Sequence, residues 1–165
     1  AYRKAVALLA ESEFIDIFGV ENSLTPAMDL FTKLGYLGLT CRLNTDAYLQ
    51  QIGAGHLPHG AVAVAFSHSG SSADTVKALR LAKSHGAKTI AITNAIGAPL
   101  ASWADVTLLT GRDSHTIYGN AIFSRVADTA LVDMLYMGVI LSGYGRFSTA
   151  LDESGRMIRD RVFEN

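Results

Sequence analysis

Cysteine, net charge and long apolar runs are all scarce in this sequence, and each scarcity excludes a class of protein. Cys41 is the only cysteine among the 165 residues, which excludes an internal disulfide and a zinc site built from cysteines. Its apolar neighbours favour a small buried hydrophobic residue over a nucleophile. The 14 basic and 15 acidic residues leave a net charge of -1, which is too neutral for a surface that binds nucleic acid.

The sequence also shows no membrane span and no signal peptide. Its apolar runs are too short to cross a bilayer, and Glu11 and Glu13 interrupt the short apolar stretch near the start of the chain. We therefore expect a cytoplasmic protein that does not bind a membrane. Because residues 1–9 form a helical pattern without a preceding start signal, we also expect the chain to be part of a longer protein.

Hydrophobic residues make up 49% of the sequence, enough for one large core in a single domain over residues 1–165. Strand-like runs alternate with helical patterns, which predicts an α/β fold, a doubly wound five-stranded parallel sheet flanked by helices. The expected strands are Phe14–Phe18, Leu39–Leu43, Ala61–Phe66, Thr89–Ile92 and Val106–Leu109. The expected helices are Ala1–Leu9, Thr25–Leu37, Asp46–Ala54, Ser72–His85, Pro99–Ala104, Asn120–Leu141 and Thr149–Phe163.

The strongest local signal for function is a serine-rich loop between a buried strand and a helix, with the sequence Ser67-His68-Ser69-Gly70-Ser71-Ser72. Ligands of doubly wound folds bind beyond the carboxyl ends of the strands. Gly70 permits a tight turn, and the helix that follows offers unpaired N–H groups and the positive end of its dipole to an anion. The alternative is an ordinary helix cap, since serine is a favoured capping residue. Several hydroxyls, with Thr75 one turn later, exceed what capping needs and favour anion binding.

A second loop leaves the first strand as Gly19-Val20-Glu21-Asn22-Ser23. Gly19 gives a turn, and Ser23 lies near the start of the next helix. Taken alone, this loop is equally well explained as a plain connection. If the first and third strands are neighbours in the sheet, the two loops converge on one crevice.

Other site patterns are absent from the sequence. It has no Gly-x-Gly-x-x-Gly fingerprint for a dinucleotide and no Walker lysine for a nucleotide triphosphate. It also lacks the Gly-x-Ser-x-Gly elbow of the α/β-hydrolases. No spacing of His, Cys, Asp and Glu indicates a metal site, and His56 and His59 are better explained as surface residues. We therefore expect neither a cofactor nor a metal.

The two loops resemble those of the SIS (sugar isomerase) domain, which has a flavodoxin-like fold. The resemblance is carried by Ser67-x-Ser69-Gly70-x-Ser72-x-Asp74-Thr75, by Ala82-Lys83-x-x-Gly86-Ala87-Lys88-Thr89-Ile90-Ala91-Ile92-Thr93, and by Gly19-Val20-x-Asn22-Ser23. Within that superfamily the chain is most similar to the effector domains of RpiR-type transcriptional regulators. The features behind that choice include Asp46 to Gln50, Ser124-Arg125 and Asp133-Met134-Leu135-Tyr136.

The resemblance implies a phosphosugar site. It assigns the phosphate to the side chains of Ser67, Ser69, Ser72, Thr75 and Ser23, and to the backbone N–H groups of His68, Gly70 and Ser71. Asn22 and Glu21, from the same loop as Ser23, are also expected to bind the phosphosugar. Many SIS domains have glycine at the position of Glu21, and a carboxylate beside a phosphate is unfavourable. Glu21 must therefore turn away, bind sugar hydroxyls or meet an amine.

SIS isomerases use a glutamate as the base that moves a proton between adjacent sugar carbons. Here no glutamate occurs between Glu21 and Glu153, and Asp113 is the carboxylate in the loop before the long helix. The resemblance thus favours a sugar-phosphate sensor that forms a homodimer and contacts DNA through a domain outside this chain. An aldose–ketose phosphosugar isomerase is the alternative, and a degenerate domain that only dimerises is a third. The sequence assigns no role to His115.

Overall fold

The computed structural model describes residues 1–111 and 124–159, and it contains a parallel sheet of five strands. The strands are β1 (Ile15–Phe18), β2 (Cys41–Leu43), β3 (Val62–Phe66), β4 (Lys88–Thr93) and β5 (Val106–Leu109). They lie in the order β2-β1-β3-β4-β5, and every neighbouring pair is parallel. The predicted doubly wound α/β fold is confirmed.

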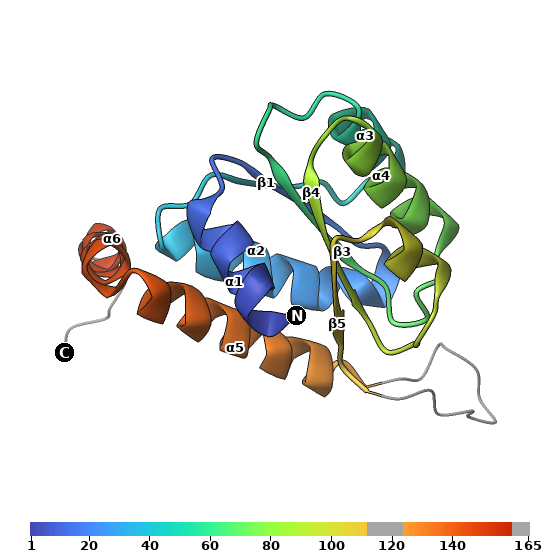
Figure 1. Cartoon of the computed structure of the whole chain (residues 1–165). Helices are drawn as coiled ribbons and strands as arrows, with labels where there is room; N and C mark the ends of the chain where they lie inside the picture. The colour runs from blue at the N-terminus through green and yellow to red at the C-terminus, as the bar shows by residue number, and fades with distance from the viewer. Residues whose placement is uncertain (112–123, 160–165) are drawn as a thin grey trace.

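The helices form a layer on each face of the sheet (Figure 1). They are α1 (Tyr2–Glu11), α2 (Leu24–Tyr36), α3 (Ala47–Ala54), α4 (Ala73–Ser84), α5 (Val126–Ser142) and α6 (Tyr144–Met157), with 3-10 turns η1 (Glu21–Ser23) and η2 (Pro99–Trp103). One face packs against α1, α2 and α5, and the other against α3, α4 and η2.

Side-chain size differs between the two faces of β3. Val62, Val64 and Phe66 point into the core beneath α1, α2 and α5, whereas Ala63 and Ala65 point toward α3 and α4. Successive side chains of a strand alternate between faces, so the large residues of β3 face one helix layer and its alanines face the other. Both faces are buried, which is why β3 is apolar throughout.

The C-terminal helices differ from the sequence prediction at their shared boundary. The prediction started the long helix near Asn120, which lies outside the described residues, but Arg125 still precedes the first turn of α5. The prediction also began the last helix near Thr149, whereas α6 begins at Tyr144 directly after Gly143. Gly143 has an extended φ of -150°. This single residue separates the two helices, whereas the prediction had left residues 142–148 outside both of them.

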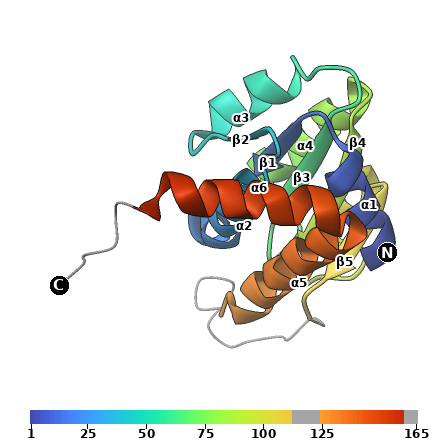
Figure 2. The ribbon, with the colours of Figure 1, turned by 90° about the vertical axis from the view of Figure 1, so that its left-hand side faces the viewer.

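The bend at Gly143 turns α6 across the end of α5 (Figure 2). Among the described residues no single helix is long and apolar enough to cross a membrane. The pair α5 and α6 passes that test only when taken together, and the chain bends by 116° between them.

Helix α5 has an apolar stripe on its outer side that no described residue covers, formed by Val126, Met134, Met137 and Leu141. The exposed fractions of Met134, Met137 and Leu141 are 55%, 49% and 68%. The sequence suggests that the last helix could cover this face through Leu151, Met157, Ile158 and Val162. Leu151 is partly buried against the main core, and Val162 lies outside the described residues. In the structure Met157 is 78% exposed and Ile158 is also exposed, so these two side chains leave the stripe open.

Candidate phosphate-binding site

The two loops singled out in the sequence meet because their strands are neighbours. β1 and β3 are paired, with Phe18 opposite Ala65, so the loops that leave their carboxyl ends lie side by side. Between these loops is a cavity of about 240 Å³. Its lining residues are Val20, Glu21, Asn22, Ser23, Ser67, His68, Ser69, Ser72 and Arg125.

Three helices begin at this cavity, and each begins after a residue that lines it. Ser23 precedes α2, Ser72 precedes α4 and Arg125 precedes α5. A helix N-terminus carries a partial positive charge and presents backbone N–H groups. None of the three side chains makes a capping hydrogen bond to its own helix. The hydroxyls of Ser23 and Ser72 are therefore not used as ordinary caps, which removes the support for the capping alternative.

Gly70 fixes the shape of the serine-rich loop. Its φ is +62°, and a Cβ at this position would lie 2.4 Å from Ala98 Cβ and 2.8 Å from Thr93 Oγ1. Its carbonyl accepts a hydrogen bond of 2.9 Å from Leu100 N, and its N–H donates to Ser67 O at 3.0 Å. Only glycine fits this backbone without strain.

Seven of the ten predicted site residues line the cavity, and the other three have different positions. Gly70 serves the turn, as described above. Thr75 is fully buried and its Oγ1 donates to Ser72 Oγ at 3.4 Å, so it can orient the Ser72 hydroxyl. Ser71 is exposed, and its N–H donates to Ser69 Oγ at 3.2 Å. The N–H groups of Gly70 and Ser71 are thus engaged within the loop, whereas the resemblance had assigned them to the phosphate.

The loop after β1 is clamped by a residue that the sequence reasoning had not placed at the site. Gln50 of α3 is 1% exposed. Its side chain accepts from Gly19 N at 3.3 Å and donates to Gly19 O at 2.7 Å and Asn44 O at 2.8 Å. Since leaving a buried amide unsatisfied is costly, Gln50 holds this loop in one conformation.

Arg125 is the cation among the residues that line the cavity; the sequence analysis names it only as part of the resemblance to RpiR-type regulators. It is 15% exposed, and its Nε lies 4.0 Å from Oδ2 of the buried Asp128. The sequence prediction had placed Arg125 inside the long helix, whereas in the structure it immediately precedes the first turn of α5. Without knowing that α5 starts beside the serine-rich loop, Arg125 could not be assigned to the site.

The electrostatic surroundings of His68 favour its neutral form. Burial lowers the pKa of the imidazole, and the nearby Arg125 charge lowers it further, although Asp128 acts in the opposite direction. The His68 carbonyl accepts hydrogen bonds from Asn94 N at 3.0 Å and Thr93 Oγ1 at 3.1 Å. These bonds tie the loop to the end of β4 and keep the ring at the cavity.

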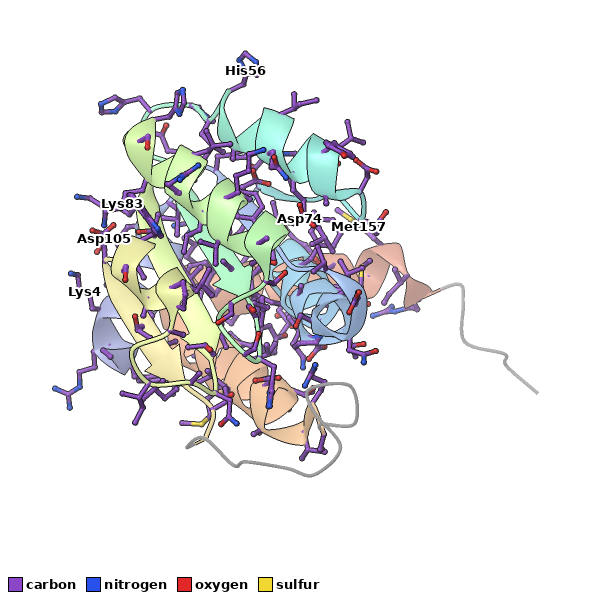
Figure 3. The ribbon with its side chains drawn as sticks, turned by 90° about the vertical axis from the view of Figure 1, so that its right-hand side faces the viewer. Lys4, His56, Asp74, Lys83, Asp105 and Met157 are labelled. Atoms are coloured by element: carbon purple, nitrogen blue, oxygen red, sulfur yellow. The ribbon has the colours of Figure 1, made fainter. Side chains whose placement is uncertain are left out.

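Other candidate residues lie away from this cavity. His56 and His59 are exposed in the connection between α3 and β3, which leads to the amino end of β3. The candidate cavity lies at the carboxyl ends of the strands, and Figure 3 shows His56 at the outside of the molecule. Burial raises the pKa of the Cys41 thiol to about 12, so it is no nucleophile at neutral pH. Asp113 and His115 lie outside the described residues. Within the described ranges no group of His, Cys, Asp and Glu side chains could hold a metal ion.

A second cavity, of about 560 Å³, lies between α1, α5 and α6. Its lining includes Val6, Ala7, Leu141 and Phe147, with Arg3 and Arg146 also present. It has no cluster of hydroxyls and is not at the carboxyl ends of the strands. The smaller cavity combines serine hydroxyls, the N-termini of three helices and Arg125, a combination that the larger cavity lacks.

These observations define a class of protein. It is a doubly wound α/β domain with hydroxyls and helix N-termini at the carboxyl ends of its strands. Residues 8–138 match the family model of the SIS domain. The chain therefore belongs to the SIS domain family, as its two loops had indicated.

The sequence relatives of this chain include proteins named as transcriptional regulators. An uncharacterized HTH-type transcriptional regulator of Caldanaerobacter subterraneus is 31% identical over 98% of the chain. The chain spans 57% of that regulator.

The solved structures show the same fold. The Vibrio vulnificus NanR protein, complexed with ManNAc-6P, has a TM-score of 0.88 and 26% identity, covering 98% of this chain and 62% of that one. The sugar isomerase domain of an RpiR transcription factor from Sphaerobacter thermophilus has a TM-score of 0.82 and 24% identity, covering 94% and 85%. A Methanococcus jannaschii protein with an inferred 3-hexulose-6-phosphate isomerase function has a TM-score of 0.73 and 14% identity, covering 93% and 82%; this shows the fold alone.

Proposed function

We propose that this domain is the sugar-phosphate-sensing effector domain of a transcriptional regulator. The observation that carries the proposal is the cavity where three helix N-termini, several serine hydroxyls and Arg125 come together. Two comparisons support it, because the NanR structure contains a phosphosugar and the sequence relative is named as a regulator. The net charge of -1 is consistent with a DNA contact made by another domain.

The phosphate in this proposal is held mainly by the serine-rich loop. Ser67 is 3% exposed, and its hydroxyl and those of Ser69, Ser72 and Ser23 line one cavity. A hydrogen bond to a charged group contributes about 1.5–3 kcal/mol. A few such bonds, with the Arg125 charge nearby, hold a dianion without a Walker-type lysine.

An aldose–ketose isomerase is the second candidate, and one observation favours it. His68 lines the cavity in a setting that lowers its pKa, and a neutral imidazole can accept a proton. Glu21 is the carboxylate among the lining residues. Solvent deuterium exchange at the carbon beside the sugar carbonyl, followed by NMR, distinguishes the two candidates. The sensor proposal predicts no protein-dependent exchange.

The outer stripe of α5 supports a homodimer. A helix on the surface of a sheet needs only one apolar side, yet Met134, Met137 and Leu141 remain exposed. Uncovered apolar surface of this kind marks an interface, and most soluble homo-oligomers have two-fold symmetry. Light scattering should give about twice the chain mass of 17.6 kDa. A Met137→Glu substitution should shift the protein to monomer, and a monomeric wild type would contradict the dimer.

A thermal-shift screen over a phosphosugar panel tests the sensor proposal. A ligand at 100 times its Kd stabilises the domain by about 2.7 kcal/mol, which raises the Tm by about 5–10 °C at this chain length. The matching unphosphorylated sugars should leave the Tm unchanged. Ser69→Ala should fold normally and lose about tenfold or more in phosphosugar affinity. No stabilisation by any phosphosugar, or equal stabilisation by the unphosphorylated sugars, would contradict the proposal.

A further inference from the structure

The backbone at Glu21 has a conformation that glycine adopts easily and other residues avoid. Its φ is +50°, the only positive φ among the described non-glycine residues. The loop around it enforces this value. The side chain of Gln50 forms hydrogen bonds with both the N–H and the carbonyl of Gly19. After it, Ser23 N donates to Val20 O at 3.0 Å, and Leu24 N donates to Glu21 O. A glutamate here costs free energy that a glycine would not.

Among the residues that the structure describes, no contact of the Glu21 side chain compensates that cost. Among the described residues its carboxylate forms neither a salt bridge nor a hydrogen bond, and the residue is exposed at the cavity. Its role in the fold is therefore small, and what remains is its effect on whatever occupies the cavity.

The charge of Glu21 opposes a bare phosphate. It shares the cavity with the serine hydroxyls and Arg125, and the buried Asp128 lies beside Arg125. A dianion placed among these groups meets one cation and two carboxylates. A carboxylate accepts hydrogen bonds and cannot donate them, so it becomes favourable only when the ligand brings donors of its own.

We propose that Glu21 is a specificity-determining residue that accepts hydrogen bonds from the sugar end of a phosphosugar and disfavours inorganic phosphate. This inference rests on the proposed function. Sugar hydroxyls and a sugar ammonium group are both donors that a carboxylate can accept. A site whose carboxylate accepts hydrogen bonds from such donors selects strongly against ligands that lack them, because the carboxylate is then left without a partner.

The test uses calorimetry to measure, for each variant, the affinity for inorganic phosphate and the affinity for phosphosugars. The probes are inorganic phosphate, glucose 6-phosphate, glucosamine 6-phosphate and N-acetylmannosamine 6-phosphate. Glu21→Gln and Glu21→Gly should each bind inorganic phosphate about threefold or more tightly, since a repulsive charge is removed. Both should bind the phosphosugar preferred by the wild type about tenfold more weakly, since a charge-assisted hydrogen bond is lost.

The two variants separate the carboxylate from the backbone strain. Glu21→Gly removes both, whereas Glu21→Gln keeps the strain, so only Glu21→Gly should raise the Tm. The affinity changes should appear in both variants. Glu13→Gln, an exposed change at the opposite edge of the sheet, should change neither affinity.

The outcomes distinguish this inference from the proposed function. A loss confined to glucosamine 6-phosphate would identify the ammonium as the donor, and an equal loss for all three sugars would identify hydroxyls. If the wild type binds inorganic phosphate as tightly as every phosphosugar, or if the variants leave the ratio of the two affinities unchanged, the role of Glu21 is overturned while the phosphate site stands. If the wild type binds none of the four probes, the proposed function itself fails.

Discussion

Replacing Gly70 by alanine tests how firmly the fold holds the serine-rich loop. The new Cβ would lie 2.4 Å from Ala98 Cβ and 2.8 Å from Thr93 Oγ1, with φ at +62°. The left-handed backbone costs alanine about 1–2 kcal/mol, and overpacking costs about 1–3 kcal/mol more. Hydrogen bonds from Gly70 N to Ser67 O and from Leu100 N to Gly70 O prevent an easy shift of the backbone. We expect Gly70→Ala to lower the free energy of unfolding by about 2–5 kcal/mol.

Gly86→Ala is the matched control for this change. Gly86 has a φ of +86°, and a Cβ there meets no atom within 4 Å, so this variant carries only the backbone cost of about 1–2 kcal/mol. Urea unfolding of both variants isolates the contribution of the clash with Ala98 and Thr93. Gly70→Ala should also weaken phosphosugar binding, whereas Gly86→Ala should not. Equal stability losses in the two variants would refute the close packing assigned to the loop.

Two further predictions concern the charges at the cavity. Arg125→Gln should weaken inorganic phosphate binding about tenfold and flatten its dependence on salt, whereas Arg146→Gln at the other cavity should leave it unchanged; calorimetry at two ionic strengths measures both. His68 has a lowered pKa in the folded state because of burial and the Arg125 charge, so its neutral form contributes stability above the unfolded pKa of about 6.5, and that contribution is lost as the pH falls. Between roughly pH 7.5 and pH 5.5 the wild type should therefore lose more unfolding free energy than His68→Asn; an equal loss would exclude this linkage.

The strands and the serine-rich loop were predictable because their signals are local. A run such as residues 61–66 is apolar on both faces, as a strand covered on both sides must be. The serine-rich loop was visible as hydroxyls around a glycine between a strand and a helix. The sequence predicted that the two loops would converge if the first and third strands were neighbours. The structure pairs β1 with β3, so the loops do converge.

The contributions of Gln50 and Arg125 were not predictable, because each depends on a distant contact. Gln50 acts on Gly19, 31 residues away, and Arg125 reaches the cavity only through the placement of α5. The strain at Glu21 was equally hidden, since φ cannot be read from the residue type. Periodicity also failed near Gly143, because it left residues 142–148 outside both helices, whereas a single extended residue separates α5 from α6.

A crystal structure of the domain with N-acetylmannosamine 6-phosphate tests the central claim most directly. The account predicts phosphate oxygens within about 3.2 Å of the hydroxyls of Ser67, Ser69 and Ser72. It also predicts the sugar ring on the side of Glu21 and the Arg125 side chain near the phosphate. A phosphosugar bound elsewhere, for example in the cavity between α1, α5 and α6, would contradict it.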